Sequence, residues 1–165
     1  MRFVFALTLA LLVEVWAACA GGPSHAAEST LPTPRFAALR SDEVNVRTGP
    51  GVRYPIDWVF TRKTLPVQIT AEVDTWRKIR AVDGTEGWVH QSMLTGRRTA
   101  LITGEVRTLH QKNDPATPAV AMVEPGVIGQ LLECRDAWCR LDVQGQKGWL
   151  PRDEFWGVLP AENFK

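Results

Sequence analysis

The sequence predicts an all-β protein built from two tandem small β-barrels, and three observations indicate this fold class. First, the chain repeats itself: the segment around Trp76 recurs around Trp138, and the Gly-Trp pair at 87–88 recurs at 148–149. Second, apolar residues alternate in short runs that Gly, Pro and Asp interrupt roughly every 8–12 residues. Third, no ten-residue segment beyond the N-terminal stretch has helical periodicity. Short strands with regular turns are typical of a sandwich or barrel.

Residues 1–26 are expected to be a secretory signal peptide. A single charge at Arg2 precedes an apolar run, and small residues follow it. The run contains Glu14 and is shorter than the roughly 20 apolar residues of a spanning helix, so we expect cleavage, after Ala20 or after Ala26. The alternative is a buried N-terminal helix. Export places the protein in the periplasm of a Gram-negative bacterium, with no transmembrane span.

The positions of the three cysteines indicate two kinds of modification, lipid attachment and a disulfide. Cys19 follows two alanines in the leader, so attachment of a lipid anchor there is an alternative to simple cleavage. Cleavage beyond it leaves Cys134 and Cys139, an even pair in an exported chain, which predicts a disulfide between facing hairpin strands. Zinc would need four ligands, and His90 and His110 have no recognisable spacing with these cysteines, so no metal or other cofactor is expected.

The predicted mature chain consists of an extended tail and two units, with a short join from 95 to 99. The tail covers 27–37, the first unit 38–95 and the second unit 100–158. Each unit contains short alternating apolar runs, at Val44/Val46, Val67/Ile69/Ala71 and Ile79/Ala81, and then at Leu141/Val143. Asp83-Gly84 and Gln144-Gly145 each predict a hairpin turn. The glycines that precede Trp88 and Trp149 predict a kink or bulge that lets the indole lie against a neighbouring strand.

Three motifs of the first unit resemble the bacterial SH3-like (SH3b) domain family. These are Asn-Val-Arg-Thr-Gly-Pro at 45–50, Trp-Arg-Lys-Ile at 76–79 and Gly-Trp-Val at 87–89. The second unit keeps its two tryptophans but has Val-Arg-Thr-Leu-His at 106–110 in place of the opening motif. Its cysteine hairpin resembles the divergent second repeat of exported bacterial members. The resemblance implies strongly bent five- or six-stranded barrels that help to bind cell-wall polymer or peptide.

The nearly balanced charge of the sequence argues against nucleic acid as a partner. The sequence has 19 Lys plus Arg against 18 Asp plus Glu, a formal net charge of +1. A nucleic-acid binder should show a concentrated basic stripe, and the only basic neighbours are the scattered pairs at 62–63, 77–78 and 97–98. No nucleic acid is therefore expected as a partner.

Aromatic side chains are the best candidates for binding, because they anchor peptides and sugars. Strand alternation places Trp76 on one face of its strand and the core residues Ile79 and Ala81 on the other face. Trp76 is therefore expected to face outward, and Trp138 repeats this arrangement. Trp58 lies with Tyr54 and Pro55 in the long first loop, where exposed aromatics would form a groove. Trp88 and Trp149 are instead expected to close the cores, and Arg47 is expected to brace the first loop.

No catalytic constellation is visible in the sequence. A nucleophile needs a base with an orienting partner, and neither His90 nor His110 lies in such a motif. The glycines at 49 and 51 do not form a phosphate loop, because no lysine accompanies them. We therefore expect a non-catalytic binding module of the cell envelope that recognises peptidoglycan or wall peptides. The alternative is a structural scaffold that docks another exported protein, and a small hydrolase is the least favoured interpretation.

Overall fold

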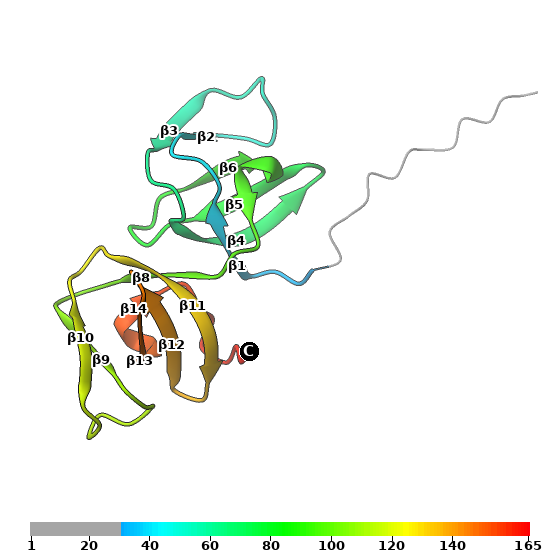
Figure 1. The fold of residues 1–165 in the computed structure, drawn as a ribbon. Helices are drawn as coiled ribbons and strands as arrows, with labels where there is room; N and C mark the ends of the chain where they lie inside the picture. The colour runs from blue at the N-terminus through cyan, green and yellow to red at the C-terminus, as the bar shows by residue number, and fades with distance from the viewer. Residues whose placement is uncertain (1–30) are drawn as a thin grey trace, which may run out of the picture.

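The computed structural model describes residues 31–165, and it is all-β with two tandem units (Figure 1). Each unit is a bent seven-stranded antiparallel sheet, which confirms the predicted fold class with more strands than the five or six expected. The predicted signal peptide and the lipid attachment at Cys19 lie outside the described residues. Among residues 31–165, no helix is long and apolar enough to cross a membrane.

The first unit has the strand order β3-β2-β6-β5-β4-β1-β7. Its elements are β1 (Arg35–Leu39), β2 (Val44–Arg47), β3 (Ile56–Phe60), β4 (Pro66–Val73), β5 (Trp76–Arg80), β6 (Glu86–His90), the 3-10 turn η1 (Gln91–Met93) and β7 (Leu94–Thr95). The strand β3 forms one edge of this sheet, and the long β4–β5 hairpin forms its centre.

The second unit has the order β10-β9-β13-β12-β11-β8-β14, which matches the first unit position by position. Its elements are β8 (Thr99–Ile102), β9 (Arg107–His110), β10 (Ala119–Val123), β11 (Ile128–Arg135), β12 (Trp138–Val143), β13 (Gln146–Pro151), the 3-10 turn η2 (Arg152–Glu154) and β14 (Phe155–Trp156). The sequence repeat is therefore also a repeat of topology.

Both units extend beyond the boundaries expected from the sequence. The strand β1 begins at Arg35, inside the segment predicted as an extended tail, because the apolar residues Phe36 and Ala37 are buried there. Ala37 pairs with Val67 of β4. At the other end, Phe164 forms a β-bridge with Cys134, beyond the predicted end of the second unit at 158.

Alternation along the strands separates core from surface. In β5, Arg77 and Ile79 are buried, whereas Trp76 and Lys78 are half-buried on the opposite face. Each unit has its own apolar core, formed by the inward-facing residues of its strands. The predicted second hairpin is a two-residue connection in which Gln144 and Gly145 have φ of 51° and 88°, as a type I′ turn requires.

The two units pack against each other. The ring of Phe36 meets that of Trp156 edge to face, with centroids 5.0 Å apart. Leu101 of the second unit belongs to the core cluster of the first. The hydroxyl of Thr99 donates to the carbonyl of Thr64 at 2.8 Å. These contacts hold the outer surfaces of both units in one arrangement.

Candidate functional site

An aromatic cluster lies on the outer face of the first unit, where strands β5 and β6 pair. Trp76 stands directly opposite His90, and the two rings meet edge to face with centroids 5.5 Å apart. Trp88 lies two residues before His90 on the same face, so it is a diagonal neighbour of Trp76. All three side chains are half-buried. We call this set, Trp76, Trp88 and His90, the first aromatic cluster.

The second unit carries a corresponding cluster of Trp138, Trp149 and His110. The rings of His110 and Trp138 meet edge to face with centroids 5.8 Å apart, and His110 pairs with Trp149 across strands β9 and β13. We call this set the second aromatic cluster. Its histidine comes from β9, whereas the histidine of the first cluster comes from β6. The same combination of two indoles and one imidazole is thus reached from different strands.

The positions of Trp88 and Trp149 correct an expectation from the sequence. Both were expected to close the cores, but both lie on the outer face. Gly87 and Gly148 occupy the adjacent inward positions instead. A Cβ atom on Gly148 would lie 2.7 Å from Cβ of Leu109, so β9 leaves no room for a side chain there. The glycines therefore face inward, and each indole faces outward.

Ion pairs flank the first cluster along the same face. Nζ of Lys78 lies 2.9 Å from Glu86, and Arg80 lies 2.6 Å from the same carboxylate. Hydrogen bonds from Lys78, the larger effect, and from Arg80 hold the pKa of Glu86 below its ordinary value. Two cations thus share one carboxylate, so the face offers aromatic surface beside a charged rim with a small positive excess.

The first loop holds Tyr54 and Pro55 in structural roles. Nη1 of Arg47 donates to the carbonyl of Tyr54 at 2.7 Å and to that of Val52 at 3.2 Å, as expected for a residue that braces this loop. The carbonyl of Pro55 accepts from the amide of Thr48 at 3.2 Å. The ring of Tyr54 packs so closely over Gly49 that a Cβ atom there would overlap it. The ring of Tyr54 therefore packs against the loop itself, whereas the side chain of Pro55 is exposed.

Trp58 stands apart from both clusters. It lies on the edge strand β3 with 52% of its surface exposed, beside the exposed side chains of Ile56 and Val59. Within residues 31–165, its ring makes no aromatic contact with Trp76 or Trp138. Of the five candidates from the sequence, the structure therefore places Trp76 and Trp138 in aromatic clusters, Trp58 at an edge, and Tyr54 and Pro55 in the loop. The other members of the two clusters, which sequence reasoning missed as binding candidates, lie on the outer faces of β6, β9 and β13.

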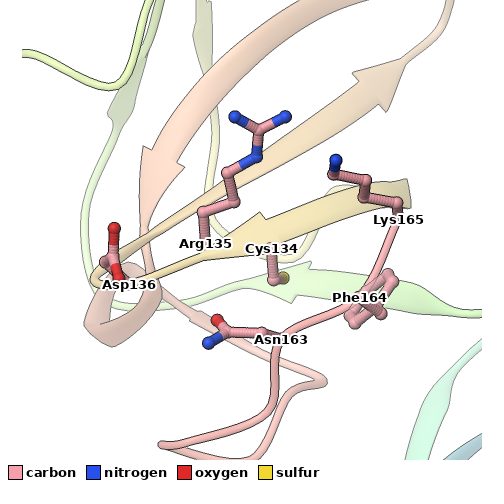
Figure 2. A pocket seen from close by; sticks show the side chains of 6 residues that line it. All are labelled: Cys134, Arg135, Asp136, Asn163, Phe164 and Lys165. Carbon is pink, nitrogen blue, oxygen red and sulfur yellow. The ribbon is translucent and has the colours of Figure 1, made fainter.

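The predicted disulfide between Cys134 and Cys139 is present. The two residues are cross-strand partners of β11 and β12, with an S–S distance of 2.02 Å. Both are buried in the second core. Beside them, an open pocket of about 480 Å³ lies between the β11 hairpin and the last residues described (Figure 2). Its walls are Cys134, Arg135, Asp136, Asn163, Phe164 and Lys165.

Among residues 31–165, the hydrogen-bonded Ser–His pair is Ser92 and His90, and its geometry is that of a helix-type N-cap. Oγ of Ser92 lies 2.7 Å from Nδ1 of His90, and the amide of Ser92 donates to the same nitrogen. His90 is the N-cap residue of η1, so both contacts close the start of this turn. In the described part of the chain, no group of three His, Cys, Asp or Glu side chains could hold a metal ion.

Comparison with known proteins places these features in a family. The family model described as "Bacterial SH3 domain" matches residues 40–96 and 108–157. A protein of Bacillus subtilis (strain 168) named "Putative N-acetylmuramoyl-L-alanine amidase" is 24% identical over 125 residues, which cover 69% of this chain. The match covers 24% of that protein, so this chain spans about a quarter of its length.

Similarity to solved structures is lower. NlpC2 from Trichomonas vaginalis has a TM-score of 0.36 at 13% identity, over 76% of this chain and 49% of that one. An NlpC/P60 family protein from Bacillus cereus ATCC 10987 has a TM-score of 0.33 at 14% identity, over 74% of this chain and 57% of that one.

Proposed function

This chain belongs to the bacterial SH3 domain family, and on that premise we propose that it is an exported, non-catalytic module that binds peptidoglycan. The amidase name of its curated relative links the shared region to proteins that act on the cell wall. The disulfide between Cys134 and Cys139 fits an oxidising compartment outside the cytoplasm.

The observation that carries the proposal is the pair of outer aromatic clusters. Each presents two indoles and an imidazole, in an edge-to-face arrangement, on the surface of a packed sheet. Rigid aromatic rings supply large contact areas at low conformational cost, which makes them frequent anchors of binding sites. Their place on paired strands holds them in position before a ligand arrives.

A binding role without catalysis agrees with the polar groups around the clusters. Nδ1 of His90 accepts the hydrogen bond from the amide of Ser92 that caps η1, so this nitrogen has a structural partner. The nearest carboxylate on the face, Glu86, is paired with Lys78 and Arg80. Within residues 31–165, the cluster residues therefore contribute contact surface.

The test is co-sedimentation of the purified protein with insoluble peptidoglycan. Trp76→Ala and Trp138→Ala are each expected to weaken retention by about tenfold, which corresponds to about 1.4 kcal/mol for a binding anchor. Trp58→Ala is the matched control, because it removes an exposed indole outside both clusters. Circular dichroism checks that each variant is folded. Retention of both cluster variants at the level of the parent would exclude the clusters as the binding site.

One observation favours a second candidate function, the docking of another exported protein. The edge strand β3 exposes Ile56, Trp58 and Val59 with fractions of 47%, 52% and 39%. An exposed apolar edge is suited to strand addition by a partner. In the same set of variants, loss of a stoichiometric crosslinked protein on Trp58→Ala, with no peptidoglycan binding by the parent, would favour this scaffold function.

A further inference from the structure

Among residues 31–165, three basic residues that form no ion pair with a carboxylate line one pocket at the junction of the two units. The pocket has a volume of about 380 Å³, which lies at the small end of the range for ligand sites. We call it the junction pocket, and its walls are Leu39, Arg40, Lys63, Thr64, Thr95 and Arg97. Three separate segments supply the charges: the end of β1, the β3–β4 turn and the join between the units.

No carboxylate lines this pocket. Within residues 31–165, Arg40, Lys63 and Arg97 form no ion pair, whereas the arginines packed nearby, Arg35 and Arg77, are both paired with Glu72. Like charges that share a concavity repel one another and concentrate a positive potential in it. An arrangement of this kind is stabilised when an anion enters.

Hydrogen bonds to the backbone fix the guanidinium of Arg40 and the turn residue Thr64, which follows Lys63. Nε and Nη2 of Arg40 donate to the carbonyl of Leu94 at 3.2 and 3.0 Å, so the guanidinium is held in one orientation. Thr64 has a φ of 64°, a left-handed conformation that is unusual for a β-branched residue. Its amide donates to the carbonyl of Leu39, and its carbonyl accepts from Thr99 of the second unit. Backbone strain of this type is concentrated at functional positions.

We propose that the junction pocket binds a compact oxyanion with two or more negative charges. Guanidinium and ammonium groups bind carboxylates and phosphates through charge-assisted hydrogen bonds, and the polar residues Thr64 and Thr95 line the same space. Both oxyanion types share this chemistry, so the ligand is defined by its charge and size. The site uses none of the aromatic residues of the proposed peptidoglycan site.

Titration of the protein with citrate and with pyrophosphate, at constant ionic strength, tests this site. Binding is followed through the backbone amide resonances of Thr64, Thr95 and Gly96. We expect saturable shifts with at least one of these anions and none with acetate, whose single charge cannot engage three cations. Citrate alone would assign a carboxylate ligand, pyrophosphate alone a phosphorylated one, and both together a site selective for charge.

The variant Lys63→Gln/Arg97→Gln removes two exposed cations and is expected to weaken binding at least about tenfold. The matched control Arg53→Gln/Lys112→Gln removes the same charge from positions outside the pocket and is expected to stay within about twofold of the parent. Absence of saturable shifts with both multivalent anions would overturn the proposal, as would equal affinities for the two double variants. Because Trp76 and Trp138 are intact in the parent and in both double variants, peptidoglycan co-sedimentation reports separately on the aromatic clusters.

Discussion

Replacing Gly148 by alanine tests the assignment of the two strand faces, on which the aromatic clusters depend. Gly148 lies in β13 on the core side, and Trp149 follows it on the outer side. A Cβ atom at Gly148 would lie 2.7 Å from Cβ of Leu109, 3.1 Å from the carbonyl oxygen of His110 and 3.3 Å from the carbonyl carbon of Leu109. Because these atoms are backbone or directly attached to it, no side-chain rotation can relieve the overlap.

The expected cost is about 2 kcal/mol of unfolding free energy. Overpacking of a core by one methyl group costs roughly 1–3 kcal/mol, and rigid neighbours favour the upper part of this range. The reduced freedom of the unfolded chain returns about 0.4–1 kcal/mol for a glycine-to-alanine change. The matched control is Gly96→Ala, because a Cβ atom there meets nothing within 4 Å and its φ is not positive.

Urea unfolding followed by tryptophan fluorescence measures both variants. Gly148→Ala is expected to lower the midpoint with an unchanged slope, whereas Gly96→Ala is expected to leave the midpoint unchanged or to raise it slightly. If both variants unfold at the same urea concentration as the parent, then Gly148 does not face the core. The outward position of Trp149 would then be wrong as well.

Three further perturbations have expected outcomes. Joint replacement of Cys134 and Cys139 by alanine is expected to cost about 2 kcal/mol in urea unfolding, because the closed loop is short. The hydrogen bond from Arg98 lowers the pKa of Glu162 in the folded state, so its stabilising contribution is present above the unfolded pKa and is lost as the pH falls through the folded value. Glu162→Gln is therefore expected to reduce the loss of stability between pH 5 and 3, in thermal melts, relative to the parent. Trp156→Ala is expected to cost about 3 kcal/mol and to separate the unfolding of the two units into two calorimetric transitions, because its indole packs against the first unit.

The repeat was sufficient to predict two β units, because it preserves the features that set strand register. The tryptophans at 76 and 138 and the turns that follow them recur at nearly constant spacing, and each unit builds the same strand order around them. The disulfide was predictable for the same reason, since a four-residue connection leaves facing hairpin positions as the natural geometry. Local patterns therefore determined the central hairpins.

The side occupied by Trp88 and Trp149 was not predictable from local pattern. Size and hydrophobicity favour an indole for a core position, and a glycine gives no sign of its direction. The decision depends on Val46 and Leu109, which approach the glycines from strands distant in sequence. The junction pocket could not be predicted from the sequence for the same reason. Its three basic residues come together only when β1, the β3–β4 turn and the join between the units pack against one another.

Both aromatic clusters contain an imidazole, but the histidine comes from β6 in the first unit and from β9 in the second. Opposite Trp76 stands His90, but the corresponding position opposite Trp138 is occupied by Pro151, which has no aromatic ring. The second unit instead has His110 on β9, at the place where the first unit has Arg47 on β2. Core packing does not require this exchange, because every residue involved lies on the outer face. In both units the edge of an indole thus meets an imidazole on the outer face, by two routes. This recurrence supports the proposed contact with a ligand, in addition to the capping role of His90.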